Sequence, residues 1–257
     1  MPEPAHARAH LGRLLTGWSR DRVAIANTIL NPILMLVVVR LLFGDLMRLA
    51  QGAETLDPLP LTVMMIFATQ AMNSVEAAAH GVRERQRGLV ARVAVTPGGA
   101  GPLIAGRWLF DWLRTTMSGT AALVVGIILG VRVHTWAAAG WLAVVIAVGG
   151  MFAATLAMLI GALAATPEAT MAATPLLMAV TFLNGGMVPP ERFVAAAQPI
   201  ARNNPVNHLV DAALAFNGSP LADTAAATPA WTALVWLGGL TAVAAIAAIR
   251  PLRRRLV

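Results

Sequence analysis

The sequence contains no cysteine and no lysine. Without cysteine, the chain has no disulfide bond, no thiolate nucleophile and no cysteine-ligated zinc. Without lysine, it cannot contain a Walker A phosphate-binding loop, because the Gly-x-x-x-x-Gly-Lys motif ends in that residue. The chain therefore hydrolyses no ATP through a P-loop of its own.

Other catalytic motifs are missing as well. The sequence has neither the His-Glu-x-x-His pattern of zinc peptidases nor the Gly-x-Ser-x-Gly pattern of serine hydrolases. His208 and Asp211 lie one helical turn apart, but two candidate ligands without a third are more typical of a polar helix face than of a metal site. We therefore predict that the chain is not an enzyme and holds neither a metal nor a cofactor.

Charge is scarce throughout the chain. Charged residues make up 12% of the sequence, against about 25% in a typical soluble domain, while 58% of the residues are hydrophobic. A soluble protein of this composition could not cover its surface, so the sequence predicts an all-α integral membrane protein. The arginines gather at the ends of apolar runs, which is typical of membrane topology and not of a nucleic-acid-binding face. We expect no nucleic-acid partner.

Long apolar runs recur along the sequence. Each is about as long as the roughly 20 residues that a helix needs to cross a bilayer, although the third has a shorter apolar core. We predict six transmembrane helices, at residues 23–43, 61–79, 102–130, 136–163, 169–188 and 231–249.

Two further segments are helical in pattern but do not span. Residues 4–21 place Leu11, Leu14 and Trp18 on one face, which predicts a helix lying at the membrane interface; a flexible basic tail is the alternative. Residues 190–228 are rich in proline, asparagine and alanine. We interpret them as a re-entrant or surface-lying pair of short helices, at 193–200 and 206–216.

Arginine is distributed unevenly between the two sides that six spans would create. The N-terminal segment, the loop after the second span and the C-terminus hold most of the arginines, and the opposite side holds few, mixed with acids. By the positive-inside rule both termini are cytoplasmic. An odd number of spans would put the two basic ends on opposite sides of a bacterial cytoplasmic membrane.

Several polar residues fall inside the predicted spans. Glu76 and Asp111 lie near the cytoplasmic ends of the second and third spans, where we favour neutralisation by neighbouring cations such as Arg114 over a proton relay. Uncharged polar side chains either line a translocation path or form hydrogen bonds between helices. These candidates are Asn27, Asn31, Gln70, Asn73 and Asn184.

The most charged stretch of the chain, residues 80–97, follows the second span. A short, polar, helix-prone segment between two spans suits docking onto another protein, with Leu89 and Val93 supplying an apolar side. The alternative is a solvated loop whose charges only set the membrane topology.

The order of these features resembles the membrane subunit of type 2 ABC exporters, the daunorubicin-resistance-type permeases. The motifs that carry the resemblance are Glu84-Arg85-Gln86-Arg87-Gly88 followed by Pro97, and the runs at 184–193 and 203–214. The resemblance implies a coupling helix at 82–95 and an outer re-entrant helical pair. It also implies a permease that pairs with a second copy or a paralogue and docks two separate ATP-binding subunits, which hold the ATP and magnesium.

The same resemblance implies export of an amphiphilic substrate, a drug or a lipid, from the cytoplasm or the inner leaflet. An ion-coupled secondary transporter that uses Glu76 and Asp111, and a non-transporting membrane assembly partner, are the alternatives. On the exporter interpretation, the ATP-binding subunit contacts the stretch after the second span. The predicted contact residues are Arg83, Glu84, Arg85, Arg87, Gly88, Leu89, Arg92 and Val93.

Overall fold

A computed structural model describes residues 4–52, 56–88, 101–184, 186–222 and 230–256. Every regular element within these ranges is helical, which agrees with the predicted all-α class. The long helices are α1 (Pro4–Arg20), α2 (Arg22–Gln51), α3 (Leu59–Gln86), α5 (Gly101–Ile128), α6 (Trp136–Leu163) and α10 (Ala230–Leu256). The shorter ones are η1 (Glu168–Ala173), α7 (Thr174–Phe182), η2 (Pro190–Arg192), α8 (Gln198–Arg202) and α9 (Pro205–Asn217).

Three helical segments of the described chain are long and apolar enough to cross a membrane. They are Arg22–Gln51, Trp136–Leu163 and Ala230–Ala248. Helices α3 and α5 have 28 residues each, or about 42 Å of helix, but they carry charged side chains toward one end. The apolar helices are compatible with a membrane permease, and the count of six spans stays a prediction.

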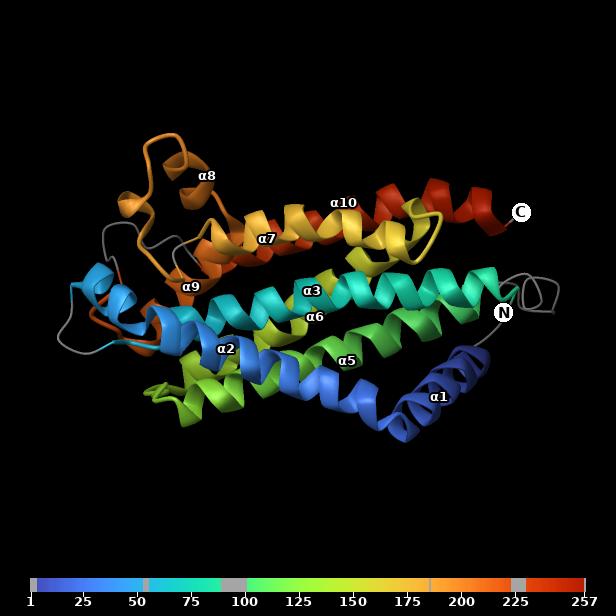
Figure 1. Cartoon of the computed structure of the whole chain (residues 1–257), viewed down its shortest axis with the longest axis horizontal. Coiled ribbons are helices and arrows are strands. Elements are labelled where there is room, and N and C mark those ends of the chain that lie inside the picture. The colour runs from blue at the N-terminus through green and yellow to red at the C-terminus, as the bar shows by residue number, and fades with distance from the viewer. Residues whose placement is uncertain (1–3, 53–55, 89–100, 185, 223–229, 257) are drawn as a thin grey trace.

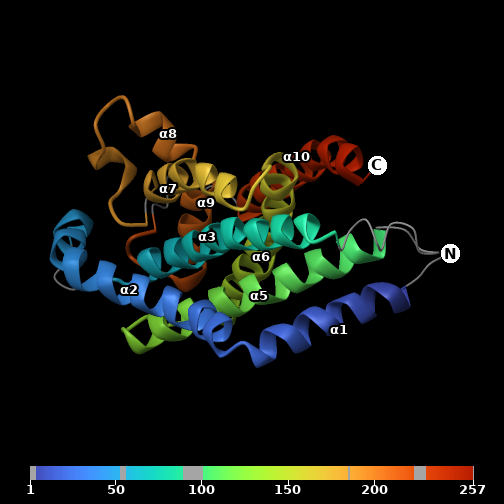
Figure 2. The same ribbon diagram turned by 45° about the vertical axis from the view of Figure 1, so that its right-hand side comes forward.

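Helix α3 occupies the centre of the bundle (Figures 1 and 2). Its buried positions run almost without a break from Leu59 to Ala79, because helices pack against it on several sides. Small residues permit the closest approaches. A β-carbon at Gly126 of α5 would collide with Thr62 of α3, as expected for a glycine at a helix crossing.

The first and the last helix of the chain reach the same end of the molecule. Figures 1 and 2 show the start of α1, the last turn of α3, the first turn of α5 and the end of α10 together. We call this region the arginine-rich end. Helix α9 and the end of α2 lie at the opposite end, called the far end.

The first predicted span is longer than expected. Helix α2 begins after Asp21, whose carboxylate accepts hydrogen bonds from the backbone N–H groups of Val23 and Ala24. It continues through Pro32 and ends at Gly52, where φ of 66° favours glycine. The helix therefore extends beyond residue 43.

The fifth predicted span, at 169–188, is wrong as a single helix. A 3₁₀ segment, η1, precedes the nine-residue α7, which starts with a proline at its second position. Asn184 then stops the helix, because its side chain accepts from the backbone N–H of Gly186 and donates to the carbonyl of Thr181. The helical stretch Glu168–Phe182 is shorter than a bilayer-spanning helix.

The pair of short helices at 190–228 also differs from the prediction. The expected helix at 193–200 is wrong, since α8 covers Gln198–Arg202 instead. Helix α9 matches the second one but does not lie on the surface, because Leu209 and Val210 are buried in the core. Asn204 holds it in place. Its side-chain amide donates to the carbonyls of Val180 at 2.6 Å and Leu183 at 2.7 Å, which joins the end of α7 to the start of α9.

Candidate functional site

The last turn of α3 carries the first half of the predicted docking stretch. The prediction of a separate helix over 82–95 is wrong at its start, because residues 82–86 continue α3 without interruption. The helix stops near Gly88, where φ is 72° and the backbone N–H donates to the carbonyl of Arg85 at 2.9 Å. Leu89, Arg92 and Val93 lie outside the described residues.

Glu84 is turned toward its own chain. One carboxylate oxygen accepts a hydrogen bond from Arg107 of α5 at 2.8 Å, and the other lies 3.3 Å from Arg13 of α1. The sequence predicted that Glu84 would contact another subunit. In the structure it joins three helices of the same chain instead, because α1 and α5 present arginines to it.

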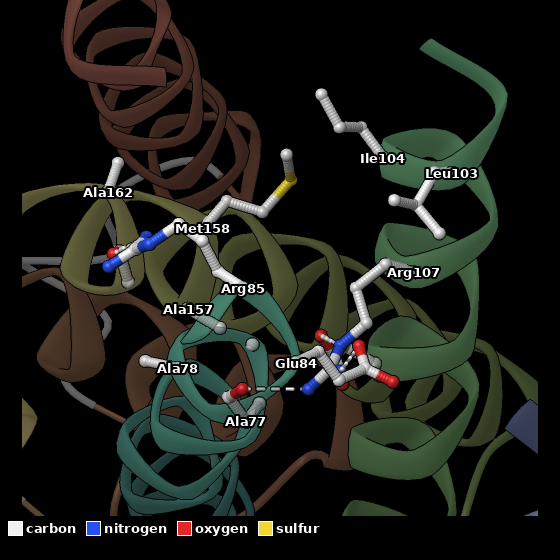
Figure 3. Close-up of a pocket in the computed structure, with 13 residues that line it drawn as sticks. Ala77, Ala78, Glu84, Arg85, Leu103, Ile104, Arg107, Ala157, Met158 and Ala162 are labelled. Carbon is white, nitrogen blue, oxygen red and sulfur yellow. Dashed lines mark hydrogen bonds and ion pairs between the residues drawn. The ribbon is translucent and has the colours of Figure 1, made fainter. Parts of the chain in front are cut away.

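Arg107 makes three contacts that fasten α5 to α3. Besides Glu84, its guanidinium binds Asp111 one turn further along α5, at 2.9 Å, and donates to the carbonyl of Ala77 at 2.8 Å. Figure 3 shows its contacts with Glu84 and Ala77 at the wall of a pocket. Since the side chain of Asp111 is only 3% exposed, this ion pair is shielded from water.

A second arginine repeats the arrangement two turns deeper. Arg114 of α5 binds Glu76 of α3 at 3.0 Å and donates to the carbonyl of Asn73 at 3.0 Å. Glu76 also lies 3.8 Å from His80. The geometry supports the favoured interpretation that cations neutralise Glu76 and Asp111, although Asp111 takes Arg107 as its partner and not Arg114.

Arg85 is also turned inward, toward α6. Its guanidinium donates to the carbonyls of Gly161 and Ala164, both at 2.8 Å, at the C-terminal end of that helix. A cation there satisfies carbonyls that have no partner in the helix and complements the helix dipole. Arg85 therefore fastens α3 to α6, where the sequence suggested a contact with another subunit.

Arg83 and Arg87 are the outward-facing members of the stretch. Both are exposed. The charge of Arg83 acts on Glu168 of η1, but neither arginine lies within ion-pair distance of an acid among the residues that the structure describes. The Glu-Arg-x-x-Gly motif thus has two parts. Glu84, Arg85 and Gly88 fix the end of α3, whereas Arg87, and Arg83 just before the motif, are exposed.

Two cavities adjoin the Arg107 ion pairs. An apolar one of about 110 Å³ lies between α3, α5 and α6, lined by small residues such as Ala78 and Gly161, with Leu103 and Met158 beside them (Figure 3). A larger one of about 470 Å³ opens between α1, α3 and α5 and is lined by charged side chains and by apolar ones such as Leu14. Both contact Glu84 and Arg107.

The residues proposed to line a path fall into two groups. Asn27 and Asn31 are exposed on α2. The other three are buried. Gln70 donates to the carbonyl of Ile146 at 2.8 Å, and Asn184 stops α7. For Asn73 the described contact is the backbone carbonyl that Arg114 binds.

Sequence reasoning missed the partners of Glu84. The spacing of the charged residues contained a signal for these partners. Arg107 and Arg114 are seven residues apart on α5, and Glu84 and Glu76 are eight apart on α3, so two antiparallel helices can form both ion pairs. No group of three or more His, Asp or Glu suited to a metal occurs among the described residues.

The sequence matches a family model described as ABC-2 type transporter over residues 7–216, from α1 to α9. Two relatives are described as probable doxorubicin resistance ABC transporter permease protein DrrC, from Mycobacterium tuberculosis strains CDC 1551 / Oshkosh and ATCC 25618 / H37Rv. Each is 27% identical to the chain over 241 residues, which is 91% of this chain and 83% of the relative.

Proposed function

The chain belongs to the ABC-2 type transporter family, and on that premise we propose that it is the permease subunit of an ABC exporter driven by separate ATP-binding subunits. Its own sequence provides no P-loop, so ATP and magnesium belong to the partner. Two permease copies, or this chain and a paralogue, form the membrane part of the assembly.

The observation that carries the proposal is the construction of the last turn of α3. Through Glu84 this turn is bound to α1 and α5, and through Arg85 to α6. A displacement of the turn is therefore passed to three other helices at once. Arg83 and Arg87 remain exposed at the same place, so an ATP-binding subunit with acidic side chains can engage it there.

The proposed orientation puts the arginine-rich end in the cytoplasm. Six crossings are made by α2, α3, α5, α6, the η1–α7 segment and α10. The η1–α7 segment is short, and α9, fixed by Asn204, completes that crossing at the far end. The positive-inside rule supports this orientation.

The proposed substrate is amphiphilic. The relatives carry doxorubicin resistance in their names, and an anthracycline is therefore a suitable probe. Asn27 and Asn31 face outward on α2 among exposed leucines, which suits a path between two permease copies. Gln70 and Asn184 have partners within the chain and so give less support to the path.

The ion-coupled alternative has weaker support. Glu76 and Asp111 each have an arginine within 3.0 Å, and a carboxylate held by a fixed cation is a poor proton carrier at neutral pH.

The docking proposal is tested by purifying the tagged full-length chain from its native membranes and identifying the proteins that accompany it. We expect an ATP-binding subunit, and vanadate-sensitive export of doxorubicin from vesicles that contain both. Replacing Arg83 and Arg87 together with alanine should lower both the co-purification and the export, since these are the exposed cations of the stretch.

The matched control replaces Arg132 and Arg192, two exposed arginines of the far end, with alanine. It removes the same charge and should leave docking unchanged. If the Arg83/Arg87 variant and the control keep the partner equally well, the stretch only sets topology and the docking proposal fails.

A further inference from the structure

The larger cavity of the arginine-rich end has an excess of cationic side chains. Four acids and five arginines line it, and the acids are already engaged: three bind Arg107, Arg114 or Arg13, and Asp21 caps α2. Arg83 and Arg87 stand at this cavity without an ion pair in the described chain. An anion is therefore the ligand that the lining charge favours.

Two deeply buried side chains in the lining have polar atoms without a partner. Arg114 is 6% exposed, and its Nε has no hydrogen-bond acceptor among the described residues. Asp111 is 2% exposed, and its Oδ1 has no hydrogen-bond donor among them. Trp18 Nε1 at the same cavity is a further unpaired donor. Buried polar groups are rarely left in this state. These atoms expose almost no surface, so they make the wall of the cavity polar without opening onto it.

Part of the lining of the cavity is apolar. Leu14 and Trp18 of α1, Ala24 of α2 and Phe110 of α5 line it beside the charged residues. The lining includes Trp18 near the end of α1 and Ala24 near the start of α2. Figure 2 shows that α1 turns into α2 there, and α2 is the first proposed membrane-crossing helix. A ligand that combines an anionic group with an apolar part, and that approaches from the membrane, matches both the cationic and the apolar side chains of the lining.

We propose that this cavity binds the headgroup of an anionic phospholipid, such as phosphatidylglycerol, from the cytoplasmic leaflet. The phosphate lies against Arg83 and Arg87, and the acyl chains leave along the apolar side chains that α1 and α2 contribute to the lining. The choice of leaflet rests on the proposed topology, but the binding depends neither on transport nor on an ATP-binding partner.

The two helix α1 glycines provide a matched pair of variants. Gly17 lines the cavity and has open space beside it, so Gly17→Phe fills the cavity without displacing backbone. Gly12 lies on the same helix with equally open surroundings but does not line the cavity, so Gly12→Phe is the control. Both substitutions change the helix propensity of α1 in the same way.

The experiment measures lipid binding to the purified full-length chain in non-ionic detergent, without any partner. Native mass spectrometry with added phosphatidylglycerol should show one lipid retained by the wild-type chain and by Gly12→Phe, and none by Gly17→Phe. Phosphatidylcholine should be released from all three. The Arg83→Gln/Arg87→Gln variant should bind phosphatidylglycerol about fivefold more weakly for each arginine removed, the factor expected for a basic side chain near an anionic surface.

Two results would overturn the proposal. Equal retention of phosphatidylglycerol by the Gly17→Phe and Gly12→Phe variants would place the lipid elsewhere, or would show that another part of the chain occupies the cavity. Displacement of the lipid by inorganic phosphate or glycerol 3-phosphate at similar concentrations would identify a site for free phosphate. Either result leaves the docking proposal intact, because docking is measured with the ATP-binding subunit.

Discussion

Arg107 is the residue on which the arginine-rich end depends most. It satisfies two carboxylates and a backbone carbonyl, all within 2.9 Å, and its side chain is 14% exposed. Removing one member of such a pair leaves a buried charge without compensation, whereas removing both members is far less costly. Comparing a single variant of Arg107 with a double variant of Arg107 and Asp111 therefore tests how much this ion pair contributes to the stability of the fold.

We predict that Arg107→Leu destabilises the folded chain by about 3–5 kcal/mol, because Asp111 is left charged and buried. The double variant Arg107→Leu/Asp111→Leu should recover most of that loss. Unfolding in mixed detergent micelles measures both. Arg48→Leu is the control, since its partner Asp45 is exposed and the pair should contribute less than about 1 kcal/mol. Equal losses in the single and double variants would contradict this account.

Glu76 allows a second prediction at the residue scale. It is neutralised by Arg114 at 3.0 Å, with its own side chain 42% exposed. We expect the Glu76→Gln variant to keep ATP-driven export in reconstituted vesicles. A protonophore should change the export rate of neither the variant nor the wild type. Vesicle experiments with an imposed proton gradient check this. Gradient-driven transport by the wild type that Glu76→Gln abolishes would favour the ion-coupled alternative.

At the scale of the helices, the crossing of α3 with α5 and α6 is set by glycines around one buried side chain. Gln70 lies between Gly119 of α5 and Gly149 of α6, and a β-carbon at either glycine would meet its amide group. Its amide nitrogen donates to a backbone carbonyl of α6. Close packing and a hydrogen bond thus hold the three helices at the same depth.

This geometry predicts opposite outcomes for two glycines of the same helix. Gly149→Ala should destabilise the bundle by about 1–3 kcal/mol, because the new methyl group collides with Gln70. Gly140→Ala should be neutral or stabilising by up to about 1 kcal/mol, since nothing lies within 4 Å of its β-carbon position. Thermal unfolding of the detergent-solubilised chain compares them.

The Gln70→Ala background sharpens the comparison. Shortening Gln70 removes the atoms that the new methyl group would meet, so the added cost of Gly149→Ala should largely disappear there. A Gly149→Ala penalty of the same size in both backgrounds would show that the crossing does not depend on Gln70.

On the scale of the whole molecule, the start of α1, the last turn of α3, the first turn of α5 and the end of α10 share one end (Figure 1). This arrangement requires an even number of crossings, as the distribution of arginine also does. We predict that reporter fusions at Met1 and at Val257 both give cytoplasmic signals. A reporter inserted between Arg132 and Val133, at the far end, should give an external signal. Opposite signals from the two termini would contradict the six-span proposal.

Much of this architecture was accessible from the sequence. The absence of lysine and cysteine excluded a P-loop and thiol chemistry. The length of one apolar run predicted both ends of α6 correctly, because a helix in lipid must form all its backbone hydrogen bonds internally and needs about 20 apolar residues to cross the bilayer. Local signals such as Asp21 and Gly88 also act within a few residues, and the structure shows them stopping or starting helices. The motifs around Glu84 and Asn204 correctly indicated the family.

The tertiary structure decided what the charged residues contact. All four charged residues from Arg83 to Arg87 lie in one polar stretch. The sequence alone therefore does not show that Glu84 and Arg85 face the bundle while Arg83 and Arg87 are exposed. Their roles diverge because α5 brings Arg107 to one side of α3 and α6 brings its C-terminal carbonyls to another. Such partners lie up to about 80 residues away in sequence, and only helix packing brings them within hydrogen-bonding distance.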